Sequence, residues 1–188
     1  MMKSSMGYHF NTAKKSSREK FEYRLQQILK SELVNYQQII ILCIGSDHFV
    51  GDCLGPMVGQ GLASSCYGGI TVYGTLESPV HAGNLEEVLN TIRSKYHNPF
   101  MIAIDSSMGE RHDIGSITLR ETGIYPGMGL GKTLPKVGNV SITGIVAQSG
   151  ITFDEFIHLV RMSLVVQITN FIVTGLLNAF DDVNLTSY

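Results

Sequence analysis

Two aspartates, Asp52 and Asp105, follow two apolar runs of strand-forming residues. Asp52 lies in the loop after the run Ile39–Gly45, and Asp105 directly follows the run Phe100–Ile104. Two carboxyl groups at close range cannot both ionise cheaply, so one of them keeps its proton. The ionised group can then take a proton from water while the protonated group donates to a carbonyl oxygen, which is chemistry for hydrolysing an amide. The structural alternative is that Asp52 caps a following helix and Asp105 caps a loop.

Polar side chains also follow the other expected strands. In open α/β sheets, ligands bind beyond the carboxyl ends of the strands, near a switch in strand order. We therefore expect these side chains to line the pocket around the two aspartates. They are Ser46, Asp47 and His48 after the first strand, Ser78 and His81 after the second, and Ser106 after the third.

A glycine-rich stretch, Gly123 to Gly144, contains the sequence GMGLGKT at positions 127–133. A phosphate-binding P-loop would need glycine at position 126, which is Pro126, so we do not expect an NTPase. The backbone N–H groups of this stretch could still hold an oxyanion or a substrate backbone. The glycines expected to do so are Gly127, Gly129 and Gly131, and a plain surface loop is the alternative.

Metal and thiol chemistry are weaker alternatives. His48, His81 or His112 could join the acids around a zinc or nickel ion, but no HxH or HxxxH motif is present, so we expect no metal and no cofactor. Cys53 could act as a nucleophile beside His48 or His81, which only its position in the loop supports. No GxSxG motif follows a strand, so a serine nucleophile is not expected.

The composition is that of one folded domain with a sizeable core. The 188 residues are 44% apolar and 16% charged, and the net charge is −2. Without a basic field we expect no nucleic-acid partner. Three cysteines and no CxxC pair favour a reducing compartment such as the cytoplasm.

Neither end of the sequence predicts a membrane segment. Residues 1–20 are polar and mostly basic, with no apolar core of a signal peptide, so we expect a mobile N-terminal arm. The apolar stretch Leu164–Phe180 contains several polar residues and predicts a buried helix, which could also contact a second copy of the chain.

Strands and helices alternate along residues 21–188, so we expect a single α/β domain: a three-layer α/β/α sandwich with a mainly parallel sheet. A TFDE capping box at Thr152 begins the last helical region, with a break near Ser163. The expected strands are 39–45, 70–76, 100–104, 116–120 at an edge, and 140–147, and the expected helices are 22–33, one from Pro56, 83–97 and 152–180.

Four segments together resemble sporulation proteins of the YyaC type, which are related to the spore germination protease and, more distantly, to the hydrogenase maturation endopeptidases. The likeness covers residues 36–180. The segments are IGSDHFVGDCLGPMVG (44–59), ESPVHAGNLEE (77–87), IAIDSS (102–107) and GIYPGMGLGKTLPKVGNVSITG (123–144).

This resemblance implies a phosphorylase/hydrolase-like sandwich and an aspartic endopeptidase. The germination protease has one catalytic aspartate in a D-x-L-G-P motif and one in an A-I-D motif, matched here by Asp52 and Asp105. Its I-x-P-G-x-G-x-G loop is matched at 124–131. The nickel-binding histidine of the hydrogenase endopeptidases has no counterpart, because no histidine lies between Asp113 and Asp154.

We therefore expect a cytoplasmic endopeptidase of the developing spore that uses Asp52 and Asp105 on a protein substrate. The resemblance makes small acid-soluble spore proteins one candidate substrate. The chain is much shorter than the germination protease and lacks its propeptide, so the alternative is an inactive binding module of spore formation that keeps the protease fold.

Overall fold

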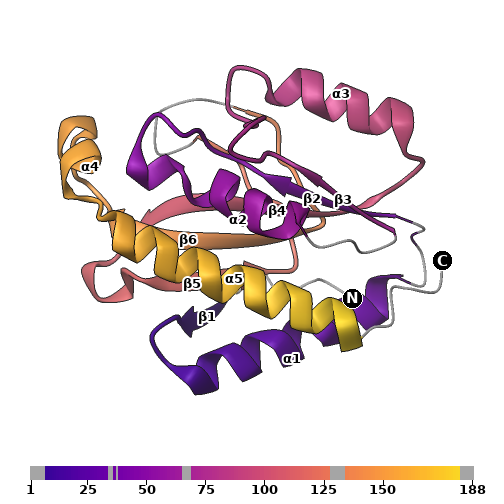
Figure 1. Ribbon diagram of the computed structural model, residues 1–188, viewed down its shortest axis with the longest axis horizontal. Coiled ribbons are helices and arrows are strands. Elements are labelled where there is room, and N and C mark those ends of the chain that lie inside the picture. The colour runs from indigo at the N-terminus through magenta and orange to yellow at the C-terminus, as the bar shows by residue number, and fades with distance from the viewer. Residues whose placement is uncertain (1–6, 34–35, 37, 65–68, 128–133, 183–188) are drawn as a thin grey trace.

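A six-stranded sheet forms the middle layer of the computed structural model, which describes residues 7–33, 36, 38–64, 69–127 and 134–182 (Figure 1). The strands are β1 (Tyr8–Asn11), β2 (Ile39–Cys43), β3 (Ile70–Tyr73), β4 (Phe100–Gly109), β5 (Ser116–Arg120) and β6 (Val140–Gln148). The helices are α1 (Lys15–Glu32), α2 (Leu54–Ala63), α3 (Leu85–Lys95), α4 (Phe153–Leu159) and α5 (Met162–Asp182).

The sheet has the strand order β1-β5-β6-β4-β2-β3 and is mainly parallel, as predicted. β3, β2, β4 and β6 run parallel, β5 runs antiparallel to β6, and β1 runs antiparallel to β5. All five residues of β2 are buried, because this strand has a neighbour on each side and a helical layer on each face. The continuous apolar run in its sequence reflects this position.

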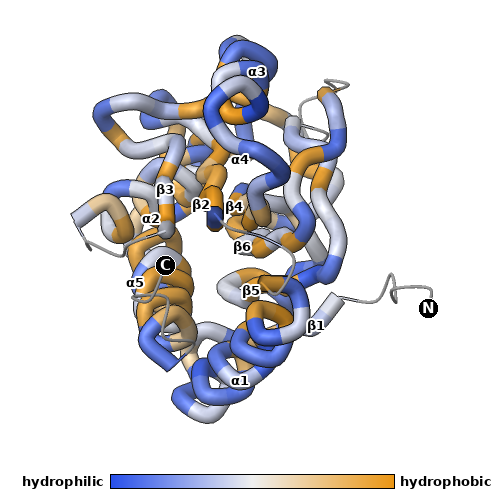
Figure 2. The backbone as a smooth tube through the Cα atoms, turned by 90° about the vertical axis from the view of Figure 1, so that its right-hand side faces the viewer, coloured by the Kyte–Doolittle hydropathy of each residue, from blue (hydrophilic) through white to orange (hydrophobic). Residues whose placement is uncertain are grey.

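The larger core lies between the sheet and helices α1, α2 and α5 (Figure 2). By length and hydropathy α5 could cross a membrane, but half of its apolar window is buried inside the fold. Phe171 and Ile172 of α5 are fully or almost fully buried there, and the ring of Phe21 of α1 contacts that of Phe171, with 5.7 Å between the ring centroids. The prediction of a buried helix is therefore confirmed.

The smaller core lies on the opposite face of the sheet, under α3. Leu85, Leu89 and Ile92 of α3 pack against β2 and β4. Helices thus lie on both faces, and the predicted three-layer sandwich is confirmed (Figure 1). On this second face β6 and β5 present Thr143 and Thr118, and this polar part of the sheet forms the floor of a cleft.

The N-terminal stretch differs from the expected mobile arm wherever the structure describes it. Tyr8–Asn11 forms the edge strand β1, and α1 already begins at Lys15. Because β1 pairs with β5, the prediction that strand 116–120 lies at an edge is wrong. Phe10 is buried and packs edge-on against Phe21 at 5.5 Å. With one buried apolar residue in four, the strand has almost no sequence signal, and its pairing with β5 stabilises it.

The third predicted strand is longer than its apolar run. β4 continues past Asp105 to Gly109, because β6 pairs with it as far as Gln148, across an irregularity at Ser107 and Met108. Asp105 therefore lies inside the strand and not after its end. The predicted capping box of Thr152 and Glu155 is confirmed, and a break at 160–161 separates α4 from α5 close to the expected position.

The close approach of α2 to the sheet can be tested at Gly59. A Cβ there would lie 2.0 Å from the backbone carbonyl oxygen of Gly74, so we expect Gly59→Ala to lower the free energy of unfolding by about 1–3 kcal/mol despite the better helix propensity of alanine. Urea unfolding followed by circular dichroism measures this.

Gly61→Ala is the matched control in the same helix. Gly61 is exposed, and its Cβ would meet only side-chain atoms of Val173, the nearest at 2.9 Å, so a change within about 1 kcal/mol is expected. Equal losses in the two variants would contradict the proposed packing of α2.

Candidate active site

The strand order changes direction at β2, which lies between β3 and β4. From β2 the chain passes through α2 to β3 on one side, and it then crosses through α3 to β4 on the other side. A crevice at the carboxyl ends of the strands is expected at such a switch point. Asp52, in the short 3₁₀ helix Val50–Asp52 that follows β2, and Asp105 of β4 both lie there.

The backbone at residues 44 and 45 brings the segments that contain the two aspartates close together. The N–H of Ile44 donates to the carbonyl oxygen of Ile104 at 2.7 Å, which places the end of β2 beside Asp105. Gly45 has a φ of 141°, and a Cβ there would lie 2.1 Å from the carbonyl oxygen of Asp52. Only glycine permits this approach, so the loop folds Asp52 back against the end of the sheet.

Burial and a neighbouring charge act together on Asp105. Burial in the strand raises its pKa well above the ordinary value, and the negative charge of Asp52 raises the pKa further. The backbone N–H of Ser106 donates to Oδ1 of Asp105 at 2.8 Å and offsets this only in part. Asp105 therefore holds a proton more readily than an ordinary aspartate does.

Neither aspartate forms an ion pair with a basic side chain in the part of the chain that the structure describes. The ion pairs found there join other residues. Asp52 does not cap α2 either: Cys53 is at the N-cap position, and no side-chain hydrogen bond caps this helix. The structural alternative, in which Asp52 serves as a helix cap, is therefore wrong.

Both aspartates line one open cleft of about 1000 Å³. Asp105, Thr143, Thr118 and His9 lie side by side across β4, β6, β5 and β1 and share its floor. Aromatic residues form one side near Asp52, where the rings of Phe49 and Phe153 meet edge to face at 5.3 Å. Tyr125 and Gly127 also line the cleft.

The cleft includes some of the residues predicted from sequence and not others. Ser106 and Gly127 line it together with Asp52 and Asp105. Ser46 is buried in the loop after β2, Asp47, His48 and Ser78 are exposed, and none of these four lines the cleft. Gly129 and Gly131 lie outside the described residues.

His81 does not line the cleft either, because its polar groups form the turn that leads into α3. Its backbone N–H donates to Oδ1 of Asn84 at 2.8 Å, and its Nδ1 accepts from the N–H of Gly83 at 3.1 Å. Asn84 occupies the N-cap position of α3, but its side chain bonds this turn and not the helix.

The cysteine alternative fits the structure poorly. Burial raises the pKa of the Cys53 thiol, and the charges of Asp52 and Asp47 raise it further, so the reactive thiolate is disfavoured. Its Sγ donates to the carbonyl oxygen of Phe49 at 3.2 Å.

Among the residues with described positions, no three His, Cys, Asp or Glu side chains gather in a way that could hold a metal ion.

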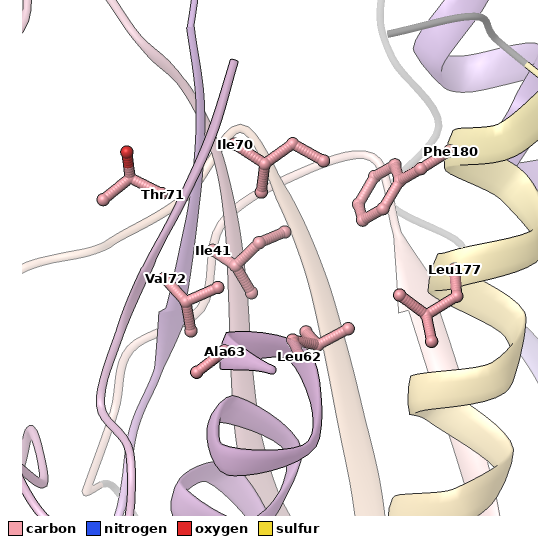
Figure 3. Close-up of a pocket in the computed structure, with 8 residues that line it drawn as sticks. All are labelled: Ile41, Leu62, Ala63, Ile70, Thr71, Val72, Leu177 and Phe180. Atoms are coloured by element: carbon pink, nitrogen blue, oxygen red, sulfur yellow. The ribbon is translucent and has the colours of Figure 1, made fainter. Parts of the chain in front are cut away.

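A second, smaller cavity of about 240 Å³ lies at the β3 edge of the sheet. Figure 3 shows Leu177 and Phe180 of α5 facing Ile41 and Ile70, while Thr71 points to the other side of β3. No ionisable side chain lines this cavity. Thr71 is the one polar side chain of its lining, so the larger cleft, which contains ionisable side chains, is the candidate site.

The cleft is also lined by polar residues that were not among the sequence candidates, including His9, Thr118, Arg120 and Thr143. The alternation of apolar and polar residues along β5 is a sequence signal for Thr118 and Arg120. Ile117 and Leu119 are buried in the larger core, which places Thr118 and Arg120 on the opposite face. His9 had no such signal, because β1 itself was not predicted.

Comparisons with known proteins agree with this extent of the domain. Residues 12–175 match the family described as "Protein of unknown function (DUF1256)". The chain is 38% identical over 155 residues to the "Uncharacterized protein YyaC" of Bacillus subtilis (strain 168), covering 81% of this chain and 76% of the relative. The likeness to YyaC-type proteins is thus supported.

The buried state of Asp105 predicts a pH dependence of stability. Its folded pKa is raised above an unfolded value of about 3.9, so between these two values the folded chain binds more protons than the unfolded chain. The ionisation of Asp105 therefore lowers the free energy of unfolding as pH rises through this window, by at most about 1.4 kcal/mol per pH unit. Asp105→Asn removes this loss.

Urea unfolding of wild type and Asp105→Asn from pH 4 to pH 8 measures the effect. The stability of the variant relative to wild type should increase with pH. Asp52→Asn tests the contribution of the Asp52 charge to the pKa of Asp105. In this variant the free energy of unfolding should fall less steeply with pH than in wild type. A difference between wild type and Asp105→Asn that is independent of pH would contradict the buried carboxyl.

Proposed function

The chain belongs to the DUF1256 family, and we propose that it is an endopeptidase-like hydrolase that cleaves a protein substrate during sporulation or germination. The main support is that Asp52 and Asp105, from separate elements, line one cleft at the switch point of the sheet. The likeness of the DCLGP and AID motifs to those of the spore germination protease supports the choice of reaction and setting.

The two carboxyl groups divide the work of amide hydrolysis. Asp105, which keeps its proton, donates it to the carbonyl oxygen of the scissile peptide bond, while Asp52 takes a proton from the attacking water. The water oxygen bonds to the carbonyl carbon and gives a tetrahedral diol. Asp52 then passes its proton to the amide nitrogen, Asp105 recovers one from a hydroxyl of the diol, and the C–N bond breaks to give an acid and an amine.

The shape of the cleft suits an extended polypeptide. Its floor spans four strands from Asp105 to His9, which at about 4.8 Å per strand is roughly 14 Å, or about four extended residues. Phe153 is 48% exposed and Tyr125 55% exposed, and these two rings offer apolar contact to substrate side chains. Backbone N–H groups near Gly127 could bind a substrate carbonyl.

Cleavage by the full chain is the direct test. Small acid-soluble spore proteins and a total spore lysate are incubated with wild type, Asp52→Asn and Asp105→Asn, and new peptide termini are identified by mass spectrometry. We expect wild type to cut at defined positions in the presence of EDTA. Each substitution should lower the rate by about 10²–10⁴-fold, because each removes one proton-transfer group.

Asp154→Asn is the matched control. Asp154 is an exposed acid of α4 that does not line the cleft, and it lies 3.6 Å from His158. The variant should cleave like wild type. Equal cleavage by all four proteins would reject the two-aspartate mechanism. If wild type cleaves nothing in either sample, the hydrolase proposal is overturned in favour of a binding module that keeps the fold.

A further inference from the structure

Arg120 is a cation in the cleft that neither aspartate uses. It is the last residue of β5, it is partly buried, and it lines the same cleft as Asp52 and Asp105. The raised pKa of Asp105 reflects burial and the charge of Asp52, with no contribution from Arg120. The charge of Arg120 is therefore not used to neutralise the catalytic pair.

Arg120 also has no carboxylate partner among the residues that the structure describes. The ion pairs found there do not include it. The next residue, Glu121, bonds Arg24 instead. The single side-chain contact found for the guanidinium is a long one, from Nη1 to Oγ1 of Thr143 at 3.5 Å. A partly desolvated guanidinium with no shorter side-chain hydrogen bond among the described residues is suited to binding a carboxylate in bidentate fashion.

The sheet register fixes where such an anion would lie relative to the chemistry. Thr143 is the register partner of Asp105 on β4 and of Thr118 on β5, and Arg120 lies two residues beyond Thr118 on the same face. With strands about 4.8 Å apart, the guanidinium next to Thr143 lies roughly 5–10 Å from Asp105. Two or three residues of an extended chain cover that distance.

We propose that Arg120 is a specificity-determining residue that binds a carboxylate of the substrate two or three residues from the scissile bond. The substrate class is therefore a polypeptide with an acidic side chain, or a free C-terminus, at that spacing. The inference rests on the proposed peptidase function for its substrate class, but the binding step needs no hydrolysis. The Thr143 hydroxyl holds the guanidinium over the cleft floor in this arrangement.

Binding of synthetic peptides tests the subsite directly. Three fluorescein-labelled peptides of ten Ala, Ser and Gln residues are used: one with a central Glu and an amidated C-terminus, one without Glu and with a free C-terminus, and one neutral and amidated. Fluorescence anisotropy with the full-length Asp105→Asn variant keeps the peptides intact. We expect one or both carboxylate peptides to bind at least about tenfold more tightly than the neutral peptide.

Variants of Arg120 separate this site from general charge. Arg120→Gln should remove the preference for the carboxylate peptides, and Arg120→Lys should keep part of it. Arg161→Gln, which removes an exposed cation that does not line the cleft, should keep the full preference. Thermal melts check that each variant is folded, and the comparison of the three peptides needs no substitution at Arg120.

Each outcome decides for or against the subsite. A preference for the Glu peptide identifies an acidic side chain, and a preference for the free C-terminus identifies a terminal carboxylate. Equal binding of all three peptides, or an unchanged preference in Arg120→Gln, overturns the proposal. Wild type that cleaves proteins without any carboxylate preference would refute the subsite alone, whereas a carboxylate preference without cleavage would refute only the hydrolase.

Discussion

The arrangement of the site depends on one costly feature: an ionisable carboxyl group on a half-buried residue inside a central strand, close to a second carboxyl group. Burial and the charge of Asp52 both oppose the ionisation of Asp105, and one hydrogen bond from the N–H of Ser106 offsets this only in part. Nothing in the packing of the sheet requires an acid at that position. Such a pair is typical of sites where two similar groups must differ in protonation, which is why the pair supports acid–base chemistry.

The fold makes room for this pair by covering the two faces of the sheet unequally. Helices α1, α2 and α5 bury one face, whereas α3 packs on the part of the other face formed by β2 and β4. The polar part of this face, on β6, β5 and β1, forms the floor of the cleft, which extends from Asp105 to His9. The carboxyl group of Asp105 at one end and the cation Arg120 further along give the cleft a polarity, and a polarity of this kind can orient a polypeptide.

Much of the fold was predictable because local sequence and burial agree. The run IIILC is apolar throughout, since β2 is buried on both faces. Thr152 and Glu155 form a hydrogen-bonded capping box that predicts the start of α4. The edge strand β1 was missed because only Phe10 of its four residues is buried, and its stability comes from pairing with β5, a segment about a hundred residues away. The extension of β4 beyond Asp105 was missed for the same reason, because β6 and not the local sequence supplies its partner.

The sequence by itself determined the α/β class and singled out Asp52 and Asp105, because a strand buried on both faces must be apolar. Asp105 directly follows such a run, and Asp52 lies in the loop after another. Only the tertiary structure decided which other polar residues join them. His81 forms a local turn and Asp47, His48 and Ser78 face solvent, while Thr143, Thr118 and Arg120 reach the cleft through the pairing of β4, β6 and β5. Strand order and register bring distant residues onto one face, and neither can be obtained from the spacing of residues along the chain.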